Sequence, residues 1–263
     1  MKLLLVNSIA LIILLTFGTA SMSLAIINGN RDSHPRLISL QGQNSSCKGI
    51  LIDERIVIIA AHCMGSGGNS VYVFSLQKYF PVKDYAIHNK FVKESNTFPN
   101  DVAVLLIDKV KDADSLGPSI ELPNVETSID TKIKIFGGTH KLEGSFNFES
   151  LTPSSANFVI TGYSSTLEPS GKISIEPESD EDNRPVRICL GDSGGPSLAI
   201  ARNKTYLVGV TSIIRKSLTN FLWHGSRIKT TEDCIHSTAR IESMAYHSKW
   251  LKKAIEELKG RNL

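Results

Sequence analysis

Short runs of β-branched and aromatic residues recur along this chain, and clusters of glycine, proline, asparagine and serine separate them. Such runs predict β-strands, and many of them at this spacing indicate an all-β barrel or sandwich. The 263 residues are 41% hydrophobic, which is enough for one or two compact domains. We therefore expect an all-β fold. The expected strands include Ile56–Ile59, Val71–Phe74, Val102–Ile107, Ile133–Phe136, Phe158–Ile160 and Tyr206–Val210.

One helix is expected, at the end of the chain. An apolar stripe at helical spacing lies opposite a charged face, and Gly260 follows as a stop signal. A basic amphipathic helix could bind a membrane, but packing on the protein's own barrel is the favoured interpretation. The stripe consists of Trp250, Leu251, Ala254, Ile255 and Leu258, and the charged face of Lys252, Lys253, Glu256 and Glu257.

The first 25 residues have the composition of a secretory signal peptide. Lys2 precedes the largely apolar segment Leu3–Phe17, and the small residues Ser23 and Ala25 stand before a cleavage site after Ala25. The alternative is an uncleaved membrane anchor, because Leu3–Ile27 could just span a bilayer. Cleavage is favoured, so we expect a secreted protein, extracellular or periplasmic, that has no membrane segment after cleavage.

Four cysteines are consistent with this destination. An even number in an oxidising compartment favours two disulfides, although the count alone leaves three pairings open. A zinc site is not favoured, because no two of the cysteines have the close C-x-x-C spacing. The cysteines are Cys47, Cys63, Cys189 and Cys234.

The charge pattern excludes some partners. The formal net charge is +3, and no block of Lys and Arg appears, so nucleic-acid binding is not expected. The acidic run 176–184 is interpreted as a solvated loop. It is weak evidence for calcium, because its carboxylates follow no defined liganding order.

Three local patterns carry residue types suited to nucleophilic catalysis. A serine hydroxyl needs a neighbouring base, and a neutral imidazole is suited to that work near neutral pH. The imidazole in turn needs a buried carboxylate that fixes its tautomer, and glycines beside the serine let backbone N–H groups face an oxyanion. Each pattern alone has a structural explanation, but their joint occurrence in this order favours catalysis. The patterns are Ala60–Cys63, Asn100–Leu106 and Cys189–Pro196.

These segments resemble the motifs of the chymotrypsin–trypsin family of serine proteases, and the resemblance covers nearly all of residues 26–259. The first two patterns resemble the histidine and aspartate motifs of the family, and the third closely matches its serine motif. Ile26–Gly29 resembles the mature amino terminus, Val208–Ser212 the strand that aligns substrate, and Ala239–Trp250 the entry to the terminal helix.

The resemblance implies two six-stranded antiparallel β-barrels followed by a C-terminal α-helix. The barrels would occupy about residues 26–120 and 121–242, and the helix about 243–259. It also implies the disulfides Cys47–Cys63 and Cys189–Cys234. No cofactor or metal is implied.

The resemblance further implies a serine endopeptidase that cleaves proteins or peptides through an acyl-enzyme. Ser193 would be the nucleophile, His62 the general base and Asp101 the residue that orients it. The N–H groups of Gly191 and Ser193 would form the oxyanion hole. Asp192 would pair with the α-amino group of Ile26, which the cut after Ala25 would expose without a separate activating protease.

The chain departs from the family around the specificity pocket. Arg187 stands where trypsin-type enzymes carry an aspartate, so it could favour acidic side chains, or it could instead turn away and pair with the acidic run. Ser212, Arg187 and Ile214 are the expected substrate-binding residues. Ile213 and Ile214 replace an aromatic residue and a glycine, which would narrow the cleft.

A long insertion is the other departure from the family. The 21 residues 213–233 exceed the length expected there, and they could form a lid or bind an acidic partner. An alternative to the enzyme therefore stays open, namely a secreted binding protein on a protease fold with weak or no activity.

Overall fold

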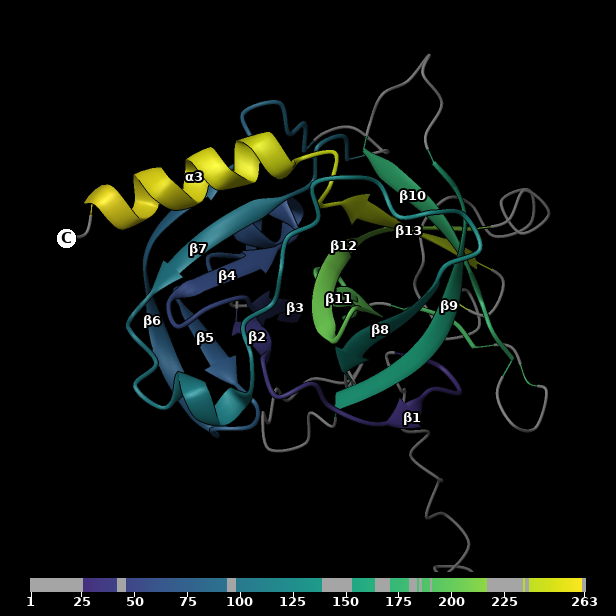
Figure 1. The fold of residues 1–263 in the computed structure, drawn as a ribbon, viewed down its shortest axis with the longest axis horizontal. Helices are drawn as coiled ribbons and strands as arrows, with labels where there is room; N and C mark the ends of the chain where they lie inside the picture. Colours follow the sequence, from purple (N-terminus) through teal and green to yellow (C-terminus); the bar gives the residue numbers. More distant parts are fainter. Residues whose placement is uncertain are drawn as a thin grey trace, which may run out of the picture.

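A computed structural model describes residues 26–41, 46–93, 98–138, 153–163, 171–179, 184, 186–189, 191–216, 234 and 237–261. The expected signal peptide and residues 217–233 of the expected insertion lie outside the described residues, as does part of the acidic run. Two β-barrels lie side by side, the first coloured purple to teal and the second mainly green in Figure 1.

The first barrel closes on itself. Its strands follow the order β2-β3-β4-β7-β6-β5, and β5 pairs back onto β2, so that every pairing is antiparallel. The strands are β2 (Leu37–Gln41), β3 (Ser46–Leu51), β4 (Ile56–Ile59), β5 (Ser70–Val73), β6 (Lys78–Ile87) and β7 (Ala103–Ile107).

The second barrel is a ring of β8-β9-β10-β13-β12-β11, which the pairing of β9 with β8 and of β11 with β8 closes. The short β1 (Asn30–Arg31) joins this barrel at β9, although it precedes the first barrel in the chain. The ring strands are β8 (Lys132–Gly138), β9 (Pro153–Tyr163), β10 (Lys172–Pro177), β11 (Pro196–Ala201), β12 (Lys204–Lys216) and β13 (Ser237–Ser243). The expected pair of six-stranded antiparallel barrels is confirmed.

Each barrel has its own apolar core. Leu, Ile and Val fill the first barrel, and β4 and β7 are buried along their whole length, since both of their faces are covered. A smaller cluster that includes Ile26, Ile135 and Ile160 fills the second barrel. All six expected segments overlap strands, because β-branched runs fit a half-buried or fully buried pleated surface.

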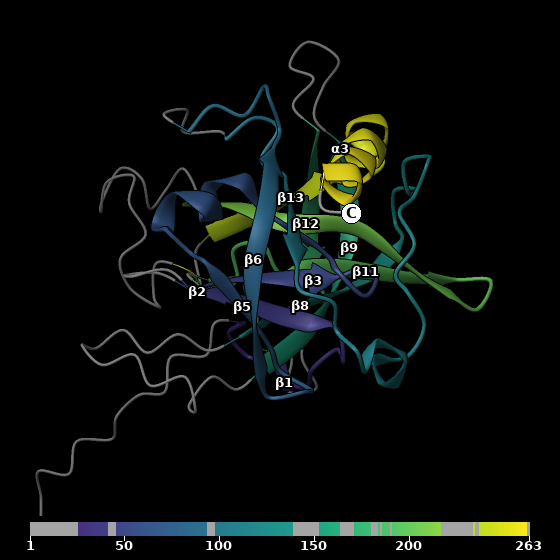
Figure 2. The ribbon, with the colours of Figure 1, turned by 90° about the vertical axis from the view of Figure 1, so that its left-hand side faces the viewer.

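The terminal helix α3 (Ser248–Arg261) leaves the second barrel and packs on the first against β6 and β7, and Figure 1 shows it beside β7. Figure 2 views the helix from its C-terminal end. Leu251, Ala254 and Leu258 are buried in the core of the first barrel, so the apolar stripe faces the protein. Two short 3₁₀ turns, η2 (Ala61–Ser66) and η3 (Ala113–Leu116), complete the described elements. Within the described ranges, no helix is long and apolar enough to cross a membrane.

Candidate active site

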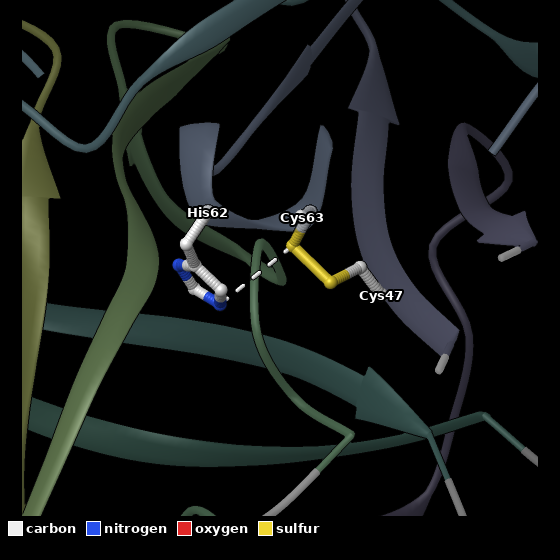
Figure 3. A group of neighbouring side chains, drawn as sticks. All are labelled: Cys47, His62 and Cys63. Atoms are coloured by element: carbon white, nitrogen blue, oxygen red, sulfur yellow. Dashed lines mark hydrogen bonds between the residues drawn. A yellow bond between two sulfur atoms is a disulfide. The ribbon is translucent and has the colours of Figure 1, made fainter. Parts of the chain in front are cut away.

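His62 lies on η2, directly after β4 of the first barrel. The neighbouring Cys63 forms a disulfide with Cys47 of β3, which ties this turn to the barrel wall (Figure 3). Potential ligand atoms of Cys47, His62 and Cys63 lie within 4.8 Å of one another, and this is the only such cluster in the described part of the chain. Both sulfurs are used in the disulfide, so the cluster lacks the thiolates that bind metal ions.

Asp101 is completely buried just before β7 and holds His62 through two contacts. The backbone N–H of His62 donates to Oδ1 of Asp101, and its Nδ1 lies against Oδ2, both at 2.8 Å. The hydroxyl of Ser212 donates to the same Oδ2 at 2.5 Å. With Nδ1–H directed at a carboxylate, the neutral imidazole carries its lone pair on Nε2, as a general base requires.

Neighbouring groups stabilise the negative charge of Asp101, although the side chain is buried. Burial alone would raise the pKa of Asp101, but the charge and hydrogen bond of His62 oppose it. The charge of Lys172 and the hydrogen bond from Ser212 act in the same direction, and the pKa of Asp101 lies below its ordinary value. The carboxylate is therefore an anion across the neutral range.

Ser193 lies in a glycine-rich turn that docks against the first barrel. Gly194 has a φ of 77°, and a Cβ there would collide with the carbonyl of Lys48 and with Ile59. The backbone N–H of Lys48 donates to the carbonyl of Ser193 at 2.7 Å. Because Ile59 ends the strand that leads to His62, this docking places the serine turn against the histidine turn. Among the described residues, Nδ1 of His62 hydrogen-bonds to Asp101, and Nε2 lies 3.8 Å from the disulfide sulfur of Cys63 and does not hydrogen-bond to Ser193 (Figure 3).

Asp192 is completely buried beside the serine. Backbone N–H groups of Cys189 and Gly138 donate to its carboxylate at 2.9 and 3.2 Å. The fully buried side chain of Ile26 lies close by, because a Cβ added at Gly137 would collide with the carboxylate of Asp192 and come within 3.1 Å of Ile26. Ile26 and Asp192 therefore both lie against Gly137.

A buried lysine that the sequence did not single out lies next to these residues. Lys48 is fully buried, and its Cε lies against Gly138, whose N–H binds Asp192. Burial lowers the pKa of Lys48 and raises that of Asp192, while the charge of each opposes the shift of the other. The available signal was a single charged residue in the otherwise uncharged strand Ser46–Leu51.

Phe98 is a second residue near His62 that the sequence did not single out. Its ring lies 5.2 Å from the imidazole of His62, centroid to centroid, with an angle of 16° between the planes. Its φ of 42° is in the left-handed region, which is uncommon for a residue with a bulky side chain. Phe98 therefore covers one face of His62 at a cost in backbone strain.

Ser212 lies in the second barrel but contacts Asp101 of the candidate triad. Its backbone lies at a β-bulge of β12, where the register with β13 shifts between Thr211 and Ile213. The bulge directs its hydroxyl to Asp101 of the first barrel.

Arg187 lines a hollow of about 380 Å³ together with Glu176 and Glu178, and none of His62, Asp101 and Ser193 lines it. Two backbone hydrogen bonds, of 2.8 and 3.1 Å, join Arg187 to Ile27. Ile214 packs against the core of the second barrel.

The second disulfide, Cys189–Cys234, lies next to the serine turn. The pairings Cys47–Cys63 and Cys189–Cys234 are those that the resemblance implies.

Comparison with known proteins gives a consistent result. The family model described as Trypsin matches residues 26–232. A collagenase of Hypoderma lineatum is 30% identical over 67% of this chain and 69% of its own. Cationic trypsin-3 of Rattus norvegicus is 26% identical over 63% of this chain and 70% of its own. Tissue-type plasminogen activator of Sus scrofa is 26% identical over 65% of this chain and 35% of its own. The chain belongs to the trypsin family of chymotrypsin-like serine proteases.

Proposed function

We propose that this protein is an active serine endopeptidase with His62, Asp101 and Ser193 as its catalytic triad. The observation that carries the proposal is the pair of contacts by which the buried Asp101 holds His62, on a turn against which the Ser193 turn docks. This arrangement leaves Nε2 of His62 as the basic atom. Apo structures often lack the serine–histidine hydrogen bond, so its absence is compatible with catalysis.

The reaction proceeds through an acyl-enzyme in two steps, acylation and deacylation. Oγ of Ser193 attacks the scissile carbonyl carbon, and its proton passes to Nε2 of His62. The tetrahedral intermediate collapses, and the departing amine takes that proton. Water then attacks the ester, again with His62 as base, and Ser193 regains its proton. The N–H groups of Gly191 and Ser193 would stabilise the oxyanion. Gly191 has a φ of 94°, a backbone conformation that glycine adopts readily and that a turn presenting these N–H groups would need.

Substrates of this enzyme would be proteins or peptides, as the names collagenase and plasminogen activator of its relatives suggest. Backbone groups next to Ser212 and the side chain of Ile214 would contact the substrate. Arg187 would contribute little to selection of the substrate side chain, because it lines a hollow beside Glu176 and Glu178 that none of the triad residues lines. The expected signal peptide and the two disulfides support secretion.

Labelling with a fluorophosphonate probe, together with hydrolysis of a peptide library, tests the proposal. The wild-type protein should be labelled and the Ser193→Ala variant should not be. Ser193→Ala and His62→Ala should each lower kcat by on the order of 10⁴–10⁶, and the double variant should be hardly worse, since the residues act as one unit. Multiplicative losses would contradict the shared mechanism. An unlabelled, inactive wild-type protein would instead favour a binding protein on this fold.

A further inference from the structure

Behind Asp101 lies a chain of buried polar groups that the triad itself does not include. The ammonium of Lys172 donates to the hydroxyl of Ser212 at 2.5 Å, and that hydroxyl donates to Asp101. On its other side Lys172 forms an ion pair with Glu242, which also contacts Nε2 of His247 at 2.5 Å. All five residues are at most 4% exposed. The connection therefore runs through buried groups from Asp101 to His247, whose ring packs against His88 of the first barrel.

Lys172 determines the direction of the hydrogen bond at Ser212. An ammonium group has three donors and no acceptor, so the oxygen of Ser212 must accept from it. The hydroxyl then has one proton left, and Oδ2 of Asp101 lies 2.5 Å away to receive it. Ser212 cannot reverse this arrangement while Lys172 is in place. The hydroxyl is thereby held as a permanent donor to the carboxylate that orients His62.

The charges along this chain alternate in sign. Asp101 is an anion, Lys172 a cation one hydroxyl away, and Glu242 a second anion beyond it. The cation lies nearer to Asp101 than Glu242 does, so it weakens the net negative field that Asp101 and Glu242 exert on His62. Removal of the lysine should strengthen that field and stabilise the imidazolium form.

Other titratable groups face the outer end of the cluster. His88 packs its ring against His247, with centroids 4.9 Å apart, and burial lowers the pKa of His88 to about 4. Glu126 accepts from Ser243, which follows Glu242 in the chain, and interacts electrostatically with His247. Burial raises the pKa of Glu126. These groups lie beyond Glu242, so Lys172 is the titratable group nearest to Asp101 on this side.

We propose that Lys172 is a positioning residue of the proposed peptidase reaction, which locks Ser212 as a donor to Asp101 and tunes the field of Asp101 at His62. The inference depends on the proposed function. It extends the triad across the interface between the barrels, because Asp101 belongs to the first barrel while Ser212, Lys172 and Glu242 belong to the second. Correct packing of the two barrels then becomes a condition for an ordered triad.

The central test is the double variant Lys172→Met/Glu242→Gln, which leaves no unpaired buried charge. We expect kcat to fall about tenfold with KM nearly unchanged, since one charge-assisted hydrogen bond is worth about that factor. The acid limb of the kcat/KM profile should move up by about half a pH unit, because the imidazolium gains stability. The control Lys204→Met/Glu121→Gln removes an exposed pair of the same type and should change neither value.

Two further variants separate the effects of charge and hydrogen bonding. Lys172→Arg keeps the charge and should leave the acid limb in place. Ser212→Ala should lower kcat about tenfold at unchanged KM, and adding the double variant should lower it little further, because both act through one hydroxyl. An unchanged kcat in Ser212→Ala, additive losses, or an unmoved acid limb would overturn the inference. If the double variant does not fold, Lys172→Gln/Glu242→Gln replaces it, because it also removes both charges but keeps side chains that can hydrogen-bond.

A readout that does not need turnover distinguishes this inference from the proposed function. The Nδ1 proton of His62 can be followed by NMR during pH titration of the Ser193→Ala protein, with and without Lys172→Met/Glu242→Gln. An upward shift of the midpoint supports the role of Lys172 even if the wild-type protein has no activity. If the wild-type protein is active and the two midpoints are identical, the role of Lys172 is refuted while the proposed function stands.

Discussion

At the scale of single residues, the candidate site includes residues whose backbone is held in an unfavourable conformation. Phe98 and Asn100 both have a positive φ, of 42° and 55°, on the segment that leads into Asp101. Strain of this kind persists only where the surroundings over-determine the conformation. Here the ring of Phe98 stacks on His62 and lies near Phe91, so the segment is held by its aromatic contacts.

Phe98→Ala should therefore reduce kcat/KM by about two- to tenfold, because an aromatic pair is worth about 0.5–1.5 kcal/mol beyond its buried area. Phe98→Gly should cause the same catalytic loss. It should nevertheless be the more stable of the two variants, because glycine adopts a positive φ without a steric cost. Kinetics and urea unfolding of both variants measure the two effects separately. Full activity in Phe98→Ala, or a less stable Phe98→Gly, would contradict this account.

Some site residues could be predicted from the sequence and others could not, for a physical reason. His62, Asp101 and Ser193 occur in local sequence patterns, and the neighbouring residues in these patterns indicate their chemistry. Lys48 and Lys172 have no such pattern, and a lysine in a strand is ordinarily solvated. Their burial depends on which segments of distant sequence meet them, and a single sequence does not contain that information.

At the scale of elements, two disulfides brace the two halves of the site in different ways. Cys47–Cys63 closes 16 residues and ties η2 to β3, whereas Cys189–Cys234 closes 45 residues next to the serine turn. The histidine turn has a second anchor, because the buried Asp101 binds both the backbone and the side chain of His62. The serine turn contacts the first barrel through Lys48.

Removal of the first disulfide should therefore cost stability more than activity. Cys47→Ala/Cys63→Ala should lower the free energy of unfolding by about 3 kcal/mol and leave kcat/KM within about threefold at 20 °C. Cys189→Ala/Cys234→Ala should cost about 4 kcal/mol and also most of the activity, because the turn with Gly191 and Asp192 loses its support. Thermal unfolding and kinetics of the two variants give the comparison. Equal catalytic losses would show that the first disulfide also positions His62.

The elements themselves were only partly predictable. The apolar runs of β4 and β7 predict strands well, because both faces of these strands are buried. The strands β10 and β13 were harder to predict, because β10 carries Lys172 and β13 carries Glu242, and these two charges pair inside the protein. The pairing of β1 with the second barrel was likewise invisible, since two polar residues carry no periodicity.

At the scale of the whole molecule, the site exists only where the two barrels meet. The first barrel contributes His62 and Asp101, and the second contributes Ser193 and Ser212. The segment that begins at Ile26 adds a third component, because it packs in the second barrel, where Ile26 and the carboxylate of Asp192 both lie against Gly137. We expect cleavage after Ala25 to place a new α-amino group beside Asp192, where it would order the oxyanion hole.

A variant with one extra residue before Ile26 should consequently lose kcat/KM by on the order of a hundredfold, because a buried carboxylate would lack its strongest partner. The loss should be incomplete, since the charge of the buried Lys48 also acts on Asp192. Lys48→Met should then abolish the remaining activity of the extended protein, yet reduce that of the protein beginning at Ile26 only several-fold. Burial lowers the pKa of Lys48, so the residual activity of the extended form should fall in alkali before an ordinary lysine would deprotonate. Amino-terminal sequencing of the exported protein identifies the natural form. Kinetics of the extended protein and of the protein that begins at Ile26, each with and without Lys48→Met, measure the coupling between the α-amino group and Lys48. An extended protein with full activity would show that the amino group is dispensable, and equal effects of Lys48→Met in both forms would show that the two cations act independently.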